Sequence, residues 1–229
     1  MKLLGLVGGV SPESTEIYYR LLNEAVRKKI GNQHSANIVL YTLDYGVMIK
    51  HYDNRDWDKF RAEVVRGAKA AAAAGAEALV ICSNTTHVGA SASASATGLP
   101  LIHILDTLVT EMNRRAVRQP LLLGTPVVMA DGFYRDELCA RFDSEVVVPS
   151  AADQAIVGRI ILDELVNGDV RDASRQELLD VCERSGGDGI ILGCTELCMI
   201  LSQEHSDRPV LDTTSIHAAA ASAFALGEE

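Results

Sequence analysis

The sequence predicts an α/β protein of two similar three-layer halves, each with a mostly parallel sheet covered by helices on both faces. Three observations predict this class. Short apolar runs alternate with longer amphipathic or alanine-rich stretches along the chain, three pairs of segments repeat in the same order, and 229 residues are enough for two modest hydrophobic cores.

Eight short apolar runs are typical of buried parallel strands, because a strand covered on both faces carries apolar side chains at successive positions. The runs are Leu3–Val7, Asn37–Leu43, Ala78–Ile81, Leu99–Ile104, Leu121–Leu123, Val146–Val148, Gly189–Leu192 and Pro209–Asp212. The stretches between most of them are long enough for helices.

The first helix has a clear predicted start and end. Ser11 can cap it, Pro12 suits its first position, and Gly31 favours its end. The alanine run at 68–76 predicts a helix that packs close to the sheet, with Gly75 near its end. The segment SASASATG at 91–98 predicts a helix tail followed by a turn.

The internal repeat defines the halves. LVGG at 6–9 matches LLGT at 122–125, ICSNT at 81–85 matches LGCTE at 192–196, and LPL at 99–101 resembles RPV at 208–210. Gly8 and Ser83 are 75 positions apart, and Gly124 and Cys194 are 70 apart. We expect a half at 1–98, to which 210–229 returns, and a pseudo-twofold related half at 99–209.

Ligands of parallel α/β sheets bind at the carboxyl ends of the strands. The repeat therefore predicts a site in a cleft between the halves, with Ser83 and Cys194 on opposite sides of one ligand.

The composition excludes several kinds of partner. A net charge of −10 argues against nucleic acid or an anionic membrane surface, and no apolar stretch approaches the roughly 20 residues of a membrane span. We expect a cytoplasmic protein that binds a small molecule. The five cysteines lack CxxC spacing, so neither disulfides nor a metal site is predicted.

Cys194 is the strongest candidate for chemistry. It follows an apolar strand and a glycine, and polar residues that can open a helix come after it. A helix amino terminus would lower the pKa of this thiol. The polar run at 83–87 follows the equivalent strand, and Asn84 and Thr85 there suit a carboxylate ligand.

The residues favour chemistry without a cofactor. The glycines of GLVGGVSPES do not form a phosphate-binding motif, since neither GxGxxG nor GK[ST] is present. Pyridoxal phosphate needs a Schiff-base lysine, and no lysine follows Lys69.

Five motifs in order resemble the aspartate racemase branch of the aspartate/glutamate/hydantoin racemase superfamily. They are GGVSPEST at 8–15, NTTH at 84–87, LLGT at 122–125, GCTE at 193–196 and DTTSIHA at 212–218. Glutamate racemases usually have His after GCT, where this chain has Glu196. The resemblance spans almost the whole chain and implies a homodimer.

The resemblance implies a two-base racemase that interconverts L- and D-amino acids without a cofactor. One residue from each half removes or returns the α-proton on opposite faces of a carbanion-like intermediate. The residues implied to hold the α-carboxylate and stabilise its enolate are Ser11, Asn84, Thr85, Thr125 and Thr195.

The chain departs from the family at the second base. The family has Cys directly before Asn-Thr, whereas this chain has Ser83 there and Cys82 one residue earlier. Ser83 is either a natural hydroxyl replacement, which makes catalysis asymmetric, or a substitution introduced to trap an inactive enzyme. Alternatively Cys82 is the base, although one step along a strand reverses the side-chain direction.

Aspartate or glutamate needs a cation for its distal carboxylate. Arg55 or Lys50, and Arg159, are the candidates by resemblance, while Glu196, Cys82 and His217 are candidates for orienting the catalytic groups. Two other functions stay open, a single-thiol decarboxylase or isomerase of the same superfamily and a non-catalytic carboxylate-binding protein.

Overall fold

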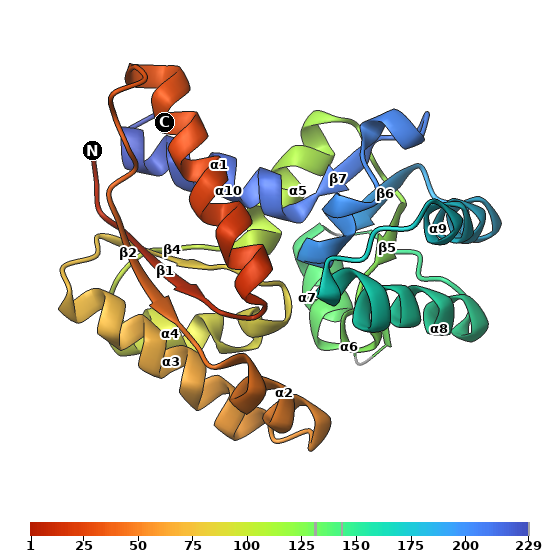
Figure 1. Cartoon of the computed structure of the whole chain (residues 1–229), viewed down its shortest axis with the longest axis horizontal. Helices are drawn as coiled ribbons and strands as arrows, with labels where there is room; N and C mark the ends of the chain where they lie inside the picture. Colours follow the sequence, from red (N-terminus) through yellow and green to blue (C-terminus); the bar gives the residue numbers. More distant parts are fainter. Residues whose placement is uncertain (131, 143, 229) are drawn as a thin grey trace. The chain divides into compact units, whose positions relative to one another are not determined.

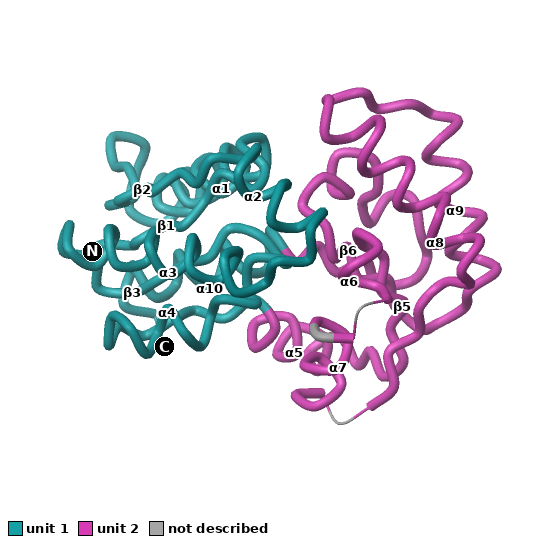
Figure 2. Tube along the Cα trace, turned by 90° about the horizontal axis from the view of Figure 1, so that it is seen from below, with its two compact units in different colours: residues 1–104, 214–229 teal, residues 105–213 magenta. Residues whose placement is uncertain are grey.

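A computed structural model describes residues 1–130, 132–142 and 144–228 of the chain, which forms two compact units (Figure 1, Figure 2). Unit 1 consists of Met1–Ile104 and Thr214–Glu229, and unit 2 of Leu105–Thr213. Each unit contains one parallel sheet with helices packed on it, so the predicted α/β class is confirmed. Among the described residues, no helix combines the length and the hydropathy of a membrane-spanning segment.

The sheet of unit 1 has four parallel strands in the order β2-β1-β3-β4. Their bounds are β1 Leu4–Gly8, β2 Ile38–Thr42, β3 Ala78–Ile81 and β4 Leu101–Ile102. The central strand β1 pairs with both β2 and β3, and every residue of β1 and β3 is buried. The apolar runs at these positions form the buried strands that the sequence predicts.

Helices cover both faces of this sheet (Figure 1). They are α1 Pro12–Ile30, α2 Tyr45–Asp53, α3 Trp57–Ala73, α4 Ala90–Thr97 and α10 Thr213–Leu226, with the short 3₁₀ helix η1 Thr85–Gly89. On one face, Leu4, Leu6 and Val80 pack with α1 and α10. On the other, Leu79 and Ile81 pack with α3. Successive residues of β3 therefore contact opposite layers.

The first helix begins and ends as predicted. The Ser11 side chain accepts the backbone N–H of Ser14 at 3.3 Å, Pro12 opens α1, and Gly31 follows Ile30 with a φ of 113°. This positive φ favours glycine, since a side chain would be strained there.

The sheet of unit 2 has three parallel strands in the order β5-β6-β7, namely Pro120–Leu123, Gly189–Leu192 and Val210–Asp212. Its helices are α5 Ile104–Arg114, α6 Pro126–Ala130, α7 Phe133–Phe142, α8 Ala151–Arg159 and α9 Asp172–Ser185. The short helical segments are η2 Ile160–Glu164, η3 Leu165–Asn167, η4 Thr195–Met199 and η5 Gln203–His205.

The two sheets share their strand order, which agrees with the internal repeat. β1, β3 and β4 lie side by side in unit 1, as β5, β6 and β7 do in unit 2. The predicted strand at Val146–Val148 forms only a parallel bridge between Val147 and Leu121. In unit 2 this bridge lies beside β5, as β2 lies beside β1 in unit 1.

The units divide a few residues after the expected boundaries at 98/99 and 209/210. β4 pairs with β3, which keeps Leu101 and Ile102 in unit 1, and β7 pairs with β6, which keeps Val210–Asp212 in unit 2. Each edge strand completes its own sheet before the chain leaves the unit. The helix that follows then packs in the other unit, α5 in unit 2 and α10 in unit 1.

Candidate active site

The polar turn after β3 carries the first group of candidate residues. Ser83 and Asn84 are buried, and η1 begins immediately after them. The Ser83 carbonyl accepts two hydrogen bonds, one from the Thr86 hydroxyl at 3.0 Å and one from Nδ1 of His87 at 2.7 Å. Two side chains of this turn thus hold the backbone of Ser83 in place. Ser83 lies at the carboxyl end of β3, where the repeat predicts it.

Cys82 lies in the hydrophobic core of unit 1. Its side chain is 1% exposed and packs with Ala78, Val80 and α10, and its Sγ lies 3.7 Å from the Val80 carbonyl oxygen. Burial raises the pKa of the Cys82 thiol far above its ordinary value. Strand alternation therefore directs Cys82 into the core, which argues against Cys82 as a base.

The turn after β6 carries the second group. The Cys194 thiol donates to Oε2 of Glu196 at 2.9 Å, and the Thr195 hydroxyl donates to the same oxygen at 2.9 Å. All three side chains are buried. One carboxylate oxygen thus accepts hydrogen bonds from two neighbouring side chains.

The expectation that a helix amino terminus lowers the pKa of Cys194 is wrong. Burial, and then the negative charge of Glu196, raise the pKa of this thiol well above its usual value. The segment that follows is the five-residue 3₁₀ helix η4, whose short dipole is outweighed by desolvation. The resting form of Cys194 is therefore a neutral thiol.

Thr125 follows β5, the strand next to β6. Its hydroxyl is shielded from solvent and has no hydrogen-bond partner in the described part of the chain. The two turns lie close together, because Gly193 N–H donates to the Leu123 carbonyl at 2.7 Å and a Cβ on Gly193 would lie 2.8 Å from that oxygen. A buried hydroxyl left unpaired costs free energy, so Thr125 is well suited to bind a polar ligand.

The glycines of the first loop have a packing role. A Cβ on Gly8 would lie 2.4 Å from the Thr15 side chain, and Gly9 has a φ of 93° and no room beside the Leu43 carbonyl. The Gly9 N–H donates to the Thr15 hydroxyl at 2.7 Å. Ser11, a predicted substrate-binding residue, caps α1 with its side chain.

The arginine candidates lie in different surroundings. Arg159 makes ion pairs with Glu164 at 2.5 Å and Glu177 at 2.8 Å. Since Glu164 is buried, Arg159 compensates a buried carboxylate. Arg55 lies in the exposed turn between α2 and α3.

His217, a candidate for orienting the catalytic groups, lies on α10 in unit 1, with its ring centroid 5.6 Å from that of His87. It is fully buried, with Nδ1 2.8 Å from the Tyr18 hydroxyl and Nε2 2.7 Å from the Ile102 carbonyl oxygen. Burial lowers its pKa to about 4. Tyr18 and His103 are not predicted from the sequence. The ring centroid of His103 lies 4.7 Å from that of His87.

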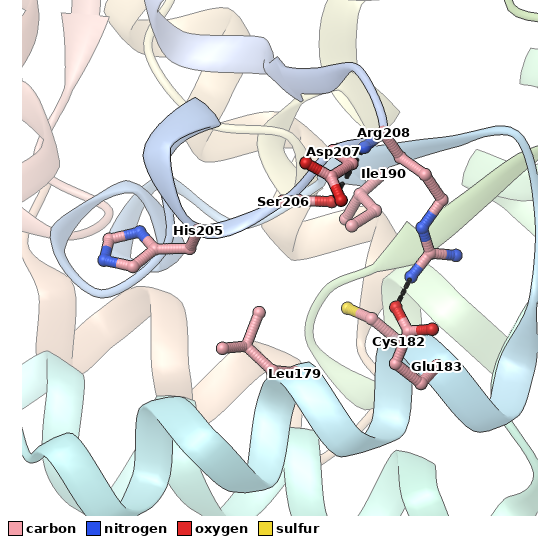
Figure 3. A pocket seen from close by; sticks show the side chains of 8 residues that line it. All are labelled: Leu179, Cys182, Glu183, Ile190, His205, Ser206, Asp207 and Arg208. Carbon is pink, nitrogen blue, oxygen red and sulfur yellow. Dashed lines mark hydrogen bonds and ion pairs between the residues drawn. The ribbon is translucent and has the colours of Figure 1, made fainter.

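A pocket of about 300 Å³ lies elsewhere in unit 2 (Figure 3). It is lined by Leu179, Cys182, Glu183, Ile190, His205, Ser206, Asp207 and Arg208. Arg208 pairs with Glu183 at 2.9 Å and donates to the Gly186 carbonyl at 2.8 Å. Ile190 is the second residue of β6, so this pocket lies near the opposite end of that strand from Cys194.

No group of three or more metal-binding side chains capable of holding an ion occurs in the described residues. The candidate residues instead follow the carboxyl ends of parallel strands. These features define a two-unit α/β protein whose buried thiol and hydroxyl groups suit a small polar ligand.

Comparison with known proteins assigns the family. The Asp/Glu/Hydantoin racemase profile matches residues 7–221. A protein of Yersinia pestis with a known crystal structure is 39% identical to this chain. The two structures match with a TM-score of 0.91 over 99% of this chain and 100% of that one. An aspartate racemase homologue of Pyrococcus horikoshii OT3 is 30% identical, with a TM-score of 0.86 over 99% and 100%.

Among characterised relatives, the broad specificity amino-acid racemase RacX of Bacillus subtilis (strain 168) is 22% identical over 215 residues, 93% of each chain. The chain belongs to the Asp/Glu/hydantoin racemase family.

Proposed function

We propose that the chain is an amino-acid racemase that works without a cofactor on aspartate or glutamate. Cys194 acts on one face of the α-carbon and Ser83 on the other. The observation that supports this most strongly is the buried Cys194 thiol, which donates to Glu196 at the carboxyl end of β6. A binding protein gains nothing from such a thiol, whereas proton transfer at carbon needs a group that can take up and return a proton.

The neutral thiol must lose its proton before it can act as a base. Glu196 is the acceptor, because its Oε2 already receives the Cys194 S–H at 2.9 Å. The proton passes from Sγ to the carboxylate, and the thiolate then removes the α-proton. The Ser83 hydroxyl protonates the carbanion on the other face. This leaves Ser83 as an alkoxide, and the proton that Cys194 gave to Glu196 passes to it through solvent, which restores the starting charges.

The carbanion needs stabilisation by groups that bind the α-carboxylate. Asn84, Thr85, Thr125 and Thr195 are the proposed donors, and Thr125 contributes a shielded hydroxyl without a partner in the described residues. Donors held in place by the turns would strengthen their bonds as charge moves onto the carboxylate, as in an oxyanion hole.

The two faces differ in base strength. A serine hydroxyl donates a proton to a carbanion but is a far poorer base than a thiolate. Since L- and D-enantiomers have equal energy, racemisation has the same kcat/KM in both directions, and the asymmetry shows in α-proton exchange. We therefore expect the enantiomer deprotonated by Cys194 to exchange its α-proton with solvent faster than its mirror image.

The test is loss of the α-proton signal in D2O, followed by proton NMR for L- and D-aspartate, L- and D-glutamate and several neutral amino acids. We expect exchange without any added cofactor, abolished in Cys194→Ala and retained in Cys139→Ser, a thiol control on α7. Failure of exchange with every amino acid would favour a decarboxylase, another isomerase or a binding protein.

A second arm of this assay tests Ser83. A thiol at this position supplies the missing base, so Ser83→Cys should speed exchange of the slower enantiomer, while Ser83→Ala should slow proton return. Equal rates for both enantiomers in wild type and in Ser83→Cys would contradict the assignment of Ser83.

A further inference from the structure

Three histidines lie together in unit 1, close to the Ser83 turn. His87 is on η1, His103 directly follows β4, and His217 is on α10. The His87 ring centroid is 4.7 Å from that of His103 and 5.6 Å from that of His217. His87 and His217 are both buried.

His87 binds two backbone groups on opposite sides of its ring. The Ile104 N–H donates to Nε2 at 3.2 Å, and Nδ1 lies 2.7 Å from the Ser83 carbonyl oxygen. An amide N–H only donates, so Nε2 carries no proton, and Nδ1 carries the proton that it donates to Ser83. The Ile104 amide thereby fixes the tautomer of His87.

Ile104 is the last residue of this segment of unit 1 and also the first residue of α5. His217 holds the other side of the same segment, because its Nε2 donates to the Ile102 carbonyl at 2.7 Å. His217 is itself oriented by the Tyr18 hydroxyl of α1. The two histidines thus bind the backbone on both sides of His103.

We propose that His87 is the positioning residue of Ser83, and that it couples the Ser83 turn to the backbone where the chain leaves unit 1. The catalytic part of this proposal rests on the proposed function of Ser83. His87 anchors the Ser83 carbonyl and so directs the adjacent hydroxyl, while Ile104 keeps His87 in the donor form that this anchoring requires.

An imidazole suits this task because it has a donor and an acceptor on opposite sides of a rigid ring. Substitution with an amide side chain removes one of the two hydrogen bonds of His87 and keeps the other. An asparagine amide can replace the donor at Nδ1, and a glutamine oxygen can replace the acceptor at Nε2. His87→Asn and His87→Gln therefore each retain one bond and lose the other.

The experiment measures amide exchange at Ile104 and the carbonyl ¹³C shift of Ser83 by NMR, together with kcat and KM for α-proton exchange. In His87→Asn we expect faster exchange of the Ile104 amide, and in His87→Gln a shift change at the Ser83 carbonyl. Both variants should lower kcat about 10- to 100-fold with KM within about twofold, the effect of a small misplacement of a reacting group.

His34→Asn is the matched control, because His34 is exposed and lies in unit 1. An unchanged Ile104 amide in His87→Asn would overturn the coupling to the unit boundary. An unchanged kcat in both variants, with both NMR signals altered, would overturn the positioning role. Absence of α-proton exchange in the wild type would refute the proposed function. The two NMR signals do not depend on turnover, so they would still test the hydrogen bonds of His87 to Ser83 and Ile104.

Discussion

At the scale of single residues, the chemistry of Cys194 depends on one neighbour. Glu196 has two opposed effects on the thiol. Its negative charge raises the pKa of Cys194, and its Oε2 is the oxygen that can accept the thiol proton. Thr195 donates to the same oxygen and holds it beside Sγ. A Cys194 thiolate would therefore lie beside a second negative charge, which is why Glu196 adds to the effect of burial on the pKa of the thiol.

Replacing Glu196 with glutamine separates these two effects. Loss of the charge lowers the pKa of Cys194 and so raises its thiolate fraction. Alkylation of Cys194 by iodoacetamide at pH 8 should therefore become about tenfold faster for each unit by which the pKa falls. The α-proton exchange should slow, because the acceptor is lost. Peptide mass spectrometry identifies the alkylated residue, and Glu24→Gln on the exposed face of α1 is the control. Slower alkylation together with slower exchange would show that Glu196 only holds the thiol in place.

At the scale of elements, ion pairs between neighbouring helical segments give Arg159 a structural role, although the sequence suggested that it binds the substrate. The Glu164 carboxylate is 3% exposed and closes η2, where it binds Arg159 of α8 and the Ser174 hydroxyl of α9. Arg171 lies 3.7 Å from the same carboxylate. Arg159 therefore joins α8 to η2 and α9, which accounts for its place in the structure without a substrate.

Arg159→Met should destabilise the fold, since it removes one cation from a buried carboxylate. We expect a loss of about 1–2 kcal/mol, less than for a fully buried pair because Arg171 remains and Arg159 is partly exposed. Urea unfolding measures the loss, and Arg20→Met, in an exposed pair with Glu24, should cost less than about 1 kcal/mol. Unchanged stability with a raised KM for aspartate and glutamate would instead identify Arg159 as a substrate ligand.

At the scale of the whole molecule, the chain passes between the units twice, and a helix follows each passage, α5 in unit 2 and α10 in unit 1. α10 closes unit 1, where Ala218, Ala221 and Ala225 pack on β1 and β3. His217 of α10 is joined to Tyr18 of α1, a residue 199 positions earlier. Unit 1 is thus assembled from the two ends of the chain, and a buried neutral histidine lies at their junction.

The stability of the protein should fall as the pH falls from 6.5 to about 4. Burial lowers the pKa of His217 from 6.5 to about 4, so in this range the unfolded chain binds a proton that the folded protein does not bind. The full loss is about 3 kcal/mol, and it is complete below pH 4.

Urea unfolding at pH 7 and pH 4 measures this loss in wild type and in His217→Gln. Glutamine does not titrate, so the difference in stability between the two proteins should shrink by about 3 kcal/mol over this range. His34→Asn is the exposed control. A difference that stays constant with pH would show that His217 does not contribute to the acid sensitivity.

Much of the fold could be predicted from local patterns. The apolar runs correspond to β1 to β7, except that Val146–Val148 forms only a parallel bridge between Val147 and Leu121. Ser11 caps α1 because a cap needs only the N–H groups of the next turn. The repeat located the turns at Ser83 and Cys194, since each of these residues lies two positions after the end of a buried strand.

The sequence by itself determined the α/β class and the paired turns, because periodicity and spacing express these features locally, whereas it left open whether Cys82 faces the core or the ligand. Only the tertiary structure decided the pKa of Cys194, the partners of Arg159, the place of His217 in unit 1 and where the units divide. These properties depend on burial and on contacts with other elements. A thiol preceding a helical turn is reactive or inert according to its solvation and neighbouring charges, and those are set by packing.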